Sequence, residues 1–171
     1  TRSRVLDSSD PGTGKTRVQI ELFAARRKRG GGAALVIAPK SLLRSAWQDD
    51  FQKFAPEMKT IVAPAEKREQ AFSQVGDVYI TNTDATKWLA QQPTSFFRCF
   101  DTLIIDELSS FKHHTSQRSK ALNKIKKHFE LVIFEIRRSF IVKLVIDVLN
   151  LHEHETMDIH QRLISTPQAS M

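Results

Sequence analysis

The chain has 171 residues, of which 40% are hydrophobic and 26% charged, the composition of an ordinary soluble globular protein with one core. Its single cysteine, Cys99, excludes an internal disulfide and indicates a reducing, cytoplasmic setting. The net charge is +7, and the excess of lysine and arginine lies within residues 1–130. A basic body of this kind suits a polyanionic partner such as nucleic acid, although many basic proteins bind none.

Short apolar runs alternate with segments of helical pattern along the chain. We expect strands at residues 4–8, 34–39, 60–64, 78–81, 102–107 and 130–136, and helices at 15–29, 41–54, 65–75, 83–92 and 116–129. The strand runs are apolar on both faces, as strands covered by helices on each side must be. This alternation predicts an α/β fold in which helices cover both faces of a mainly parallel sheet.

The pattern changes after the last expected strand. Apolar residues between Phe140 and Leu149 recur at helical spacing and predict one more helix, which a loose tail follows. Charged residues interrupt the apolar stretch 131–151 too often for it to span a bilayer, so we expect no membrane partner. We therefore divide the chain into one domain at residues 1–136 and a divergent C-terminal helix and tail at 137–171.

A basic cluster, RRKRGGG, ends the first expected helix at residues 26–32. Such a cluster can form a nucleic-acid patch, but cations in the last turn of a helix also complement its dipole. Gly30 can adopt the left-handed conformation that caps a helix. We favour the helix-end interpretation for this reason.

The segment DSSDPGTGKT, residues 7–16, lies between the first expected strand and the first expected helix. A phosphate-binding loop needs glycines and backbone N–H groups that converge on an anion at a helix N-terminus. The candidate loop consists of Ser9, Asp10, Pro11, Gly12, Thr13, Gly14, Lys15 and Thr16. In it, Lys15 would reach the β- and γ-phosphates of ATP, and the Thr16 hydroxyl would bind Mg²⁺. Ser9 stands where the full pattern has glycine, so a glycine-rich turn is the alternative.

Two adjacent carboxylates, Asp106 and Glu107, follow the apolar run TLII. An acidic residue at the end of a buried strand can reach the metal ion held by a phosphate loop. We predict that Asp106 binds Mg²⁺, directly or through water, and that Glu107 polarises the attacking water. With Lys15, these two are the candidate catalytic residues; the alternative is a solvated strand end.

Four motifs follow one another in the chain: SDPGTGKT, VIAPKSLLRSAW, YITNTDAT and LIIDELSSFKHHTSQRSKAL. In order and rough spacing they resemble the first lobe of superfamily-two helicase-like ATPases, in the Swi/Snf-type branch with its bacterial and phage relatives. The resemblance covers residues 5 to about 130. It implies a three-layer P-loop NTPase (RecA-like) domain of a nucleic-acid-dependent ATPase or translocase that uses ATP and Mg²⁺. That superfamily accepts a small residue at the position of Ser9.

The resemblance also implies contacts with nucleic acid, which we expect to be DNA bound through its backbone without sequence preference. The matching residues are Pro39, Lys40 and Ser41 in one motif and Thr81, Asn82 and Thr83 in another. A lysine and short hydroxyl or amide side chains at strand ends suit phosphate contacts. Ordinary strand-end turns are the alternative. Trp47 is expected to pack in the helix that follows the first of these motifs.

The chain departs from the family pattern in two places. A Thr-Gly-Thr-Pro-like turn is expected after the strand at 130–136 but is missing there, and LISTPQAS at 163–170 resembles it only weakly. The second lobe, which would supply arginine fingers, is also missing, and an arginine finger contributes about 10³-fold or more to the rate. We therefore expect a lobe that is truncated or altered after residue 130. We expect it to bind ATP but to hydrolyse ATP poorly. A second RecA-like lobe in another chain could complete it.

Three other functions stay open at this point. A non-catalytic nucleic-acid-binding module would keep the basic surface without the ATPase. Another P-loop NTPase, such as a packaging motor or an assembly ATPase, would share the phosphate loop but has no general reason to carry APKSLLRSAW and TNTDAT. An inactive gene fragment would account for the change of pattern near residue 131.

Overall fold

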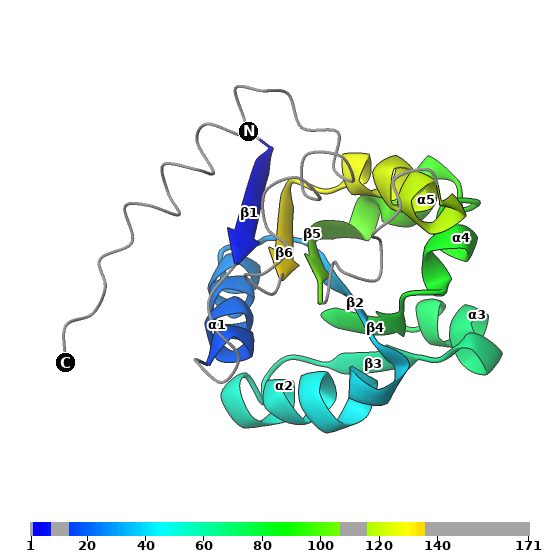
Figure 1. The fold of residues 1–171 in the computed structure, drawn as a ribbon. Helices are drawn as coiled ribbons and strands as arrows, with labels where there is room; N and C mark the ends of the chain where they lie inside the picture. Colours follow the sequence, from blue (N-terminus) through cyan, green and yellow to red (C-terminus); the bar gives the residue numbers. More distant parts are fainter. Residues whose placement is uncertain (1, 8–13, 107–115, 136–171) are drawn as a thin grey trace.

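The computed structural model describes residues 2–7, 14–106 and 116–135, which build one six-stranded sheet. Neighbouring strands are parallel throughout, in the order β1-β6-β5-β2-β4-β3 (Figure 1). The strands are β1 (Ser3–Asp7), β2 (Ala33–Ala38), β3 (Thr60–Ala63), β4 (Val78–Asn82), β5 (Phe100–Ile105) and β6 (Leu131–Glu135). Each lies where the apolar runs predicted a strand, and the parallel pairing confirms the predicted α/β class.

Helices connect the strands, and several differ from the expected ranges. They are α1 (Lys15–Lys28), α2 (Asp49–Phe54), α3 (Arg68–Phe72), α4 (Ala85–Leu89) and α5 (Gln117–Ile125), with 3₁₀ segments at Lys40–Leu42, Ala65–Lys67, Thr94–Cys99 and Lys126–His128. The helix expected at 41–54 is a 3₁₀ turn, a π-helix at Leu43–Gln48 and α2 in direct succession. Leu43 and Trp47, four residues apart in the π-helix, are both buried.

Helices α3 and α4 end earlier than the predictions at 65–75 and 83–92. Their last turns tighten, so that N–H groups bond to the carbonyl three residues back instead of four. Gln74 N donates to Ala71 O at 3.2 Å, and Gln91 N donates to Trp88 O at 3.1 Å. The sequence therefore marks these helices correctly but overstates their length.

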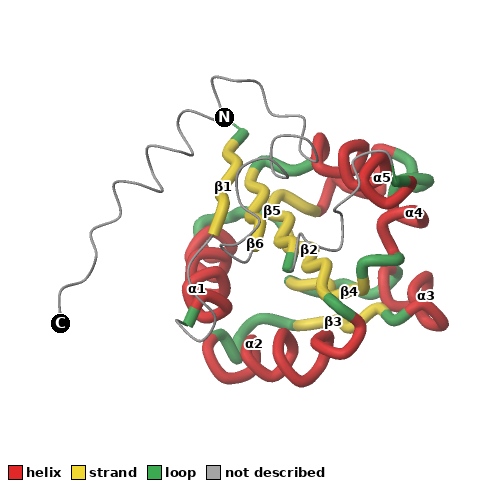
Figure 2. Tube along the Cα trace, viewed as in Figure 1, coloured by secondary structure: helices red, strands yellow, loops and turns green. Residues whose placement is uncertain are grey.

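The molecule has three layers, with helices on both faces of the sheet (Figure 2). On one face, α1, the π-helix and α2 contribute the buried side chains Ile20, Phe23, Leu43, Trp47 and Phe51, which pack on Val36, Ile80, Ile104 and Ile133. On the other face, α3, α4 and α5 contribute Ala71, Leu89, Leu122 and Ile125, which pack on Leu35, Ile37, Leu103 and Phe134. Successive strand residues thus face opposite cores, which explains why the strand runs have no polar face.

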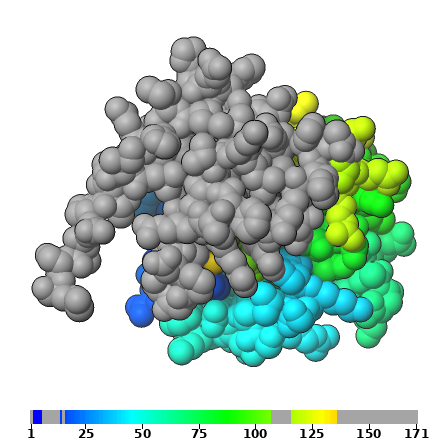
Figure 3. All heavy atoms as spheres, viewed as in Figure 1, coloured from blue at the N-terminus to red at the C-terminus, as the bar shows by residue number. Residues whose placement is uncertain are grey.

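The two helical layers form separate margins of the surface. In the space-filling view, the segment from Lys40 to Phe54 (cyan) forms the lower margin, and the layer of α3 to α5 (green to yellow) forms the right margin (Figure 3). In the described part of the chain, we find no helix long and apolar enough to cross a membrane. The helix predicted between Phe140 and Leu149 lies outside the described residues, as does the segment 163–170, so the division of the chain at residue 136 stays a prediction.

The amino ends of the strands meet at the edge where α1 ends. Gly30 follows that helix in the left-handed conformation, with φ 88°. The basic last turn forms the ion pairs Arg26–Asp101 at 3.4 Å, Arg27–Asp77 at 2.9 Å and Lys28–Glu57 at 2.9 Å. These pairs fasten the end of α1 to the segments that enter the sheet, so the helix-end interpretation of residues 26–32 is confirmed.

The carboxyl ends of the strands meet at the opposite edge, because all six strands run the same way. Ligands of open parallel sheets bind at this edge. Helix α1 begins there, and Asp106 follows β5 there. Lys40 and Thr83 follow the ends of β2 and β4 at the same edge. The fold therefore gathers four separate sequence motifs on one side of the molecule.

Candidate nucleotide and nucleic-acid site

Helix α1 begins directly after Gly14, the last glycine of the candidate phosphate loop. Gly14 caps the helix in the left-handed conformation, with φ 79° and ψ 24°, and its carbonyl accepts a hydrogen bond from Val18 N at 3.2 Å. The first turn of α1 itself contains no acidic residue at this positive end of the helix dipole. Lys15 opens the helix, and Thr16 is partly exposed in its first turn. The remaining loop residues Ser9, Asp10, Pro11, Gly12 and Thr13 lie outside the described residues.

Asp106 is held at the carboxyl end of β5. Its backbone N–H donates to Ile37 O at 2.9 Å, which extends the β5–β2 pairing by one bond. Its Oδ2 accepts a hydrogen bond from the indole N–H of Trp47 at 2.8 Å. The carboxylate is therefore partly buried and fixed in direction. Glu107, the expected catalytic base, lies outside the described residues.

Trp47 is the residue of this site that sequence reasoning assigned only to packing. Its side chain is 1% exposed and lies in the core between the sheet and the helices α1 and α2. Its ring centroid is 6.4 Å from that of Phe51. A buried indole N–H usually finds an acceptor, so the sequence could predict that Trp47 needs one, but it could not name Asp106 as that acceptor.

Hard oxygen ligands make this edge suitable for Mg²⁺. The Thr16 hydroxyl and the Asp106 carboxylate are ligand types that Mg²⁺ prefers, and phosphate oxygens and water normally complete its octahedron. Within the described ranges, no group of three or more His, Cys, Asp or Glu side chains could hold a metal ion by itself. Hydroxyl and carboxylate donors of this kind fit a metal that phosphate oxygens also bind.

Residues 39–41 leave β2 at the same edge. Pro39 is extended, with φ −55° and ψ 142°, and its carbonyl accepts from Leu42 N at 2.9 Å as the 3₁₀ turn begins. The Lys40 and Ser41 side chains are exposed. The carbonyl of Ser41 accepts from Ser45 Oγ at 3.1 Å, which holds the first turn against the π-helix. This turn thus presents a cation and a hydroxyl to solvent from a firmly bonded backbone.

The second expected nucleic-acid motif is mostly internal. Thr81 is 0% exposed, and its hydroxyl donates to Ala63 O of β3 at 2.8 Å. Asn82 is 6% exposed, and its Oδ1 accepts from Arg68 Nη2 at 3.1 Å. Only Thr83 is partly exposed. Strand β3 and helix α3 cover Thr81 and Asn82, and the contact of these residues with nucleic acid stays a prediction.

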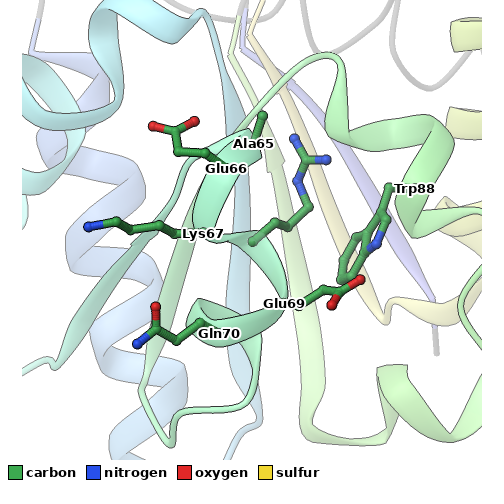
Figure 4. Close-up of a pocket in the computed structure, with 7 residues that line it drawn as sticks. Ala65, Glu66, Lys67, Glu69, Gln70 and Trp88 are labelled. Atoms are coloured by element: carbon green, nitrogen blue, oxygen red, sulfur yellow. The ribbon is translucent and has the colours of Figure 1, made fainter.

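An open hollow lies beside this motif. It has a volume of about 370 Å³ and is lined by Ala65, Glu66, Lys67, Arg68, Glu69, Gln70 and Trp88. The Arg68 guanidinium lies 5.7 Å from the Trp88 ring centroid, and burial lowers the pKa of Arg68 below its usual value. Lys67 and Gln70 point away from Trp88 in the close-up (Figure 4). The hollow carries charges of both signs, so its shape and charge select no ligand class.

Helix α5 is fastened to the motif around Thr83. Arg118 Nη2 on α5 forms an ion pair with Asp84 Oδ1. The Thr83 carbonyl accepts from Thr86 Oγ1 at 2.9 Å, which closes the first turn of α4. The element that follows the acidic pair is therefore joined directly to the end of β4.

Comparison with known proteins identifies the family. Residues 2–137 match the family model described as type III restriction enzyme, res subunit (ResIII), so the match extends past the limit near residue 130 that the motifs suggested. An uncharacterized ATP-dependent helicase of Mycoplasma genitalium is 31% identical over 107 residues, which cover 58% of this chain and 10% of that protein. The ATP-dependent helicase FUN30 of Saccharomyces cerevisiae is 32% identical over 138 residues, which cover 74% of this chain and 12% of that protein.

The fold has a counterpart among solved structures. The SWI2/SNF2 ATPase core of Sulfolobus solfataricus, solved in complex with dsDNA, superposes with a TM-score of 0.68 at 20% identity. The superposition covers 92% of this chain and 34% of that one. Among the curated helicases named above, the matching part of the chain spans only about a tenth of each protein's length. The chain belongs to the ResIII family, and its fold is that of one RecA-like lobe in a SWI2/SNF2 ATPase core.

Proposed function

We propose that this lobe binds ATP and Mg²⁺ at the carboxyl edge of its sheet, in the space between the N-terminus of α1 and the end of β5. The observation that carries the proposal is the left-handed Gly14 cap of a helix that begins at the edge where Trp47 fixes Asp106. One feature suits phosphate and the other suits the metal that accompanies it. The names of the relatives, which are ATP-dependent helicases, support the same ligand.

Each residue has a defined task in this proposal. Backbone N–H groups of the candidate loop, in which Pro11 has none to donate, would bind the phosphates, and Lys15 would bind the β- and γ-phosphates. Thr16 and Asp106 would hold Mg²⁺, which would supply positive charge to neutralise the transferred phosphoryl group. Glu107 orients the attacking water and accepts its proton. We propose that a second RecA-like lobe supplies the arginine finger that completes the reaction.

Nucleic acid binds along the same edge in this proposal. Lys40 and Ser41 contact phosphates of the DNA backbone from the turn after β2, and Thr83 contacts them from the end of β4. Support comes from their exposure and from the dsDNA complex of the Sulfolobus solfataricus relative. Thr81 and Asn82 act indirectly, because their bonds to Ala63 and Arg68 hold the end of β4 in place.

The phosphate site is tested by titration of the full chain with a fluorescent ATP analogue in the presence of Mg²⁺. Lys15→Ala should weaken binding by 10-fold or more, because a charge-assisted bond to phosphate is worth about 2 kcal/mol. Lys59→Ala is the matched control, since Lys59 is exposed and precedes β3 at the amino edge. Equal affinities for wild type and Lys15→Ala would exclude the assigned site.

DNA binding that ignores ATP would indicate the non-catalytic alternative. The lobe is mixed with labelled duplex DNA with and without the ATP analogue, and Glu107→Gln is compared with wild type. Our proposal expects the nucleotide to change DNA affinity. A salt-sensitive but nucleotide-independent affinity, the same in both proteins, would favour a binding module instead.

A further inference from the structure

The indole N–H of Trp47 reaches Asp106 from a different layer of the fold. Trp47 lies in the π-helix that follows β2, whereas Asp106 follows β5, and the donor and acceptor are 59 residues apart in sequence. The bond length of 2.8 Å between Nε1 and Oδ2 is that of a charge-assisted hydrogen bond. This contact is therefore a specific pairing of an indole donor with the carboxylate expected to meet the metal.

The surroundings of Trp47 hold its ring in place. Its side chain is 1% exposed, and Phe51 lies against it while Phe51 in turn meets Phe23 edge-on at 6.2 Å. Close packing fixes the orientation of the Trp47 ring and therefore the direction of its N–H bond. The Asp106 carboxylate must be oriented toward this N–H to keep the hydrogen bond. A π-helix turn, an element found frequently at functional sites, presents this ring.

We propose that Trp47 is a positioning residue that orients the Asp106 carboxylate for Mg²⁺. This inference rests on the proposed function in one respect, the role of Asp106 as metal ligand. A carboxylate has about four lone-pair sites, so a bond at Oδ2 is compatible with metal coordination by the same group. Partners of this kind fix the direction of metal ligands, and their removal typically weakens metal binding by about 10- to 100-fold.

The test compares the same substitution at the two tryptophans of the chain. Trp47→Phe keeps an aromatic ring in the core but removes the N–H donor, and Trp88→Phe makes the same change on α4, away from Asp106. The Mg²⁺ concentration that half-maximally enhances binding of the fluorescent ATP analogue is measured for each protein. We expect Trp47→Phe to raise it about 10-fold without changing the metal-free affinity, and Trp88→Phe to leave both values unchanged.

A second measurement leaves Trp47 intact. In the Trp88→Phe protein, Trp47 is the sole tryptophan, so its emission reports directly on the ring beside Asp106. Mg²⁺ added to the nucleotide-bound protein should shift that emission, and Asp106→Asn should abolish the shift. An emission unaffected by Mg²⁺, or a folded Trp47→Phe protein with the wild-type Mg²⁺ requirement, would refute the positioning role.

These outcomes separate the two proposals. If Lys15→Ala binds the analogue as tightly as wild type does, the nucleotide site itself is wrong. If Lys15→Ala loses binding but Trp47→Phe keeps the wild-type Mg²⁺ requirement, the site stands and Trp47 is only a packing residue. Thermal unfolding of each variant shows whether it is folded before either comparison is made.

Discussion

Arg68 donates from Nη2 to Asn82 Oδ1 at 3.1 Å and thereby joins α3 to the end of β4. The same guanidinium lies over the Trp88 ring on α4, with 5.7 Å to the centroid. One side chain thus connects three elements beside the proposed nucleic-acid edge. The strand-end residues keep their positions because of contacts of this kind, which involve side chains far apart in sequence.

Arg68→Ala should destabilise the lobe by about 1–2 kcal/mol, because it removes a hydrogen bond from a charged donor and a cation–π contact. The free energy of unfolding is measured by urea titration. Lys67→Ala is the neighbouring control, an exposed residue whose loss should change stability by less than about 0.5 kcal/mol. Equal stabilities for the two variants would contradict the joining role of Arg68.

Gly14→Ala and Gly30→Ala form a matched pair at the two ends of α1. Both glycines have left-handed φ, 79° and 88°, and a Cβ at either would meet no atom of the described residues within 4 Å. Each substitution should therefore cost about 1–2 kcal/mol in unfolding free energy through backbone strain alone. Only Gly14→Ala should also weaken binding of the ATP analogue, because Gly14 caps the end of α1 that is proposed to bind phosphate. Analogue binding weakened equally by Gly30→Ala would point to a general loss of folding instead.

Stability should fall in acid through Asp77. Burial of Asp77 raises the pKa of its carboxyl, but hydrogen bonds from Lys59 N and Arg27 outweigh it, so the pKa is below its usual value. A group with a depressed folded pKa stabilises the protein above its unfolded pKa, and that contribution is lost as the pH falls through the folded pKa, hence below about pH 4. Asp77→Asn should cost about 1–2 kcal/mol at pH 7 and less near pH 3. A cost independent of pH, seen in urea titrations at both values, would contradict this account.

Lys40→Ala should weaken duplex DNA binding and lower the slope of log affinity against log salt by about 1, because one phosphate contact disappears. Lys59→Ala at the amino edge is the control and should leave the slope unchanged. Thr81→Val should instead reduce stability by about 1 kcal/mol through loss of the bond to Ala63 O, with the salt slope of wild type. Fluorescence anisotropy at several salt concentrations measures all three variants, and a wild-type slope for Lys40→Ala would remove residue 40 from the interface.

The local patterns of the chain were enough to predict the strands and the α/β class. Runs such as ALVIA and TLII carry no polar face, and that property depends only on their own residues and on burial by helices. The helices were less predictable in length, because the π-helix at Leu43–Gln48 and the tightened ends of α3 and α4 result from packing on the sheet. The end of the first helix was predictable, since basic residues and Gly30 are local signals.

The sequence by itself determined which chemistry the site can contain: a glycine-capped helix start with lysine and threonine, an acidic pair after an apolar strand, and a lysine after another strand. These are properties of neighbouring residues, so spacing along the chain is enough to define them. Only the tertiary structure decided which side chains meet. Strand β3 and helix α3 bury Thr81 and Asn82, and Trp47 extends its N–H to Asp106 across 59 residues of sequence. Such contacts depend on the order of strands in the sheet, which no local pattern encodes.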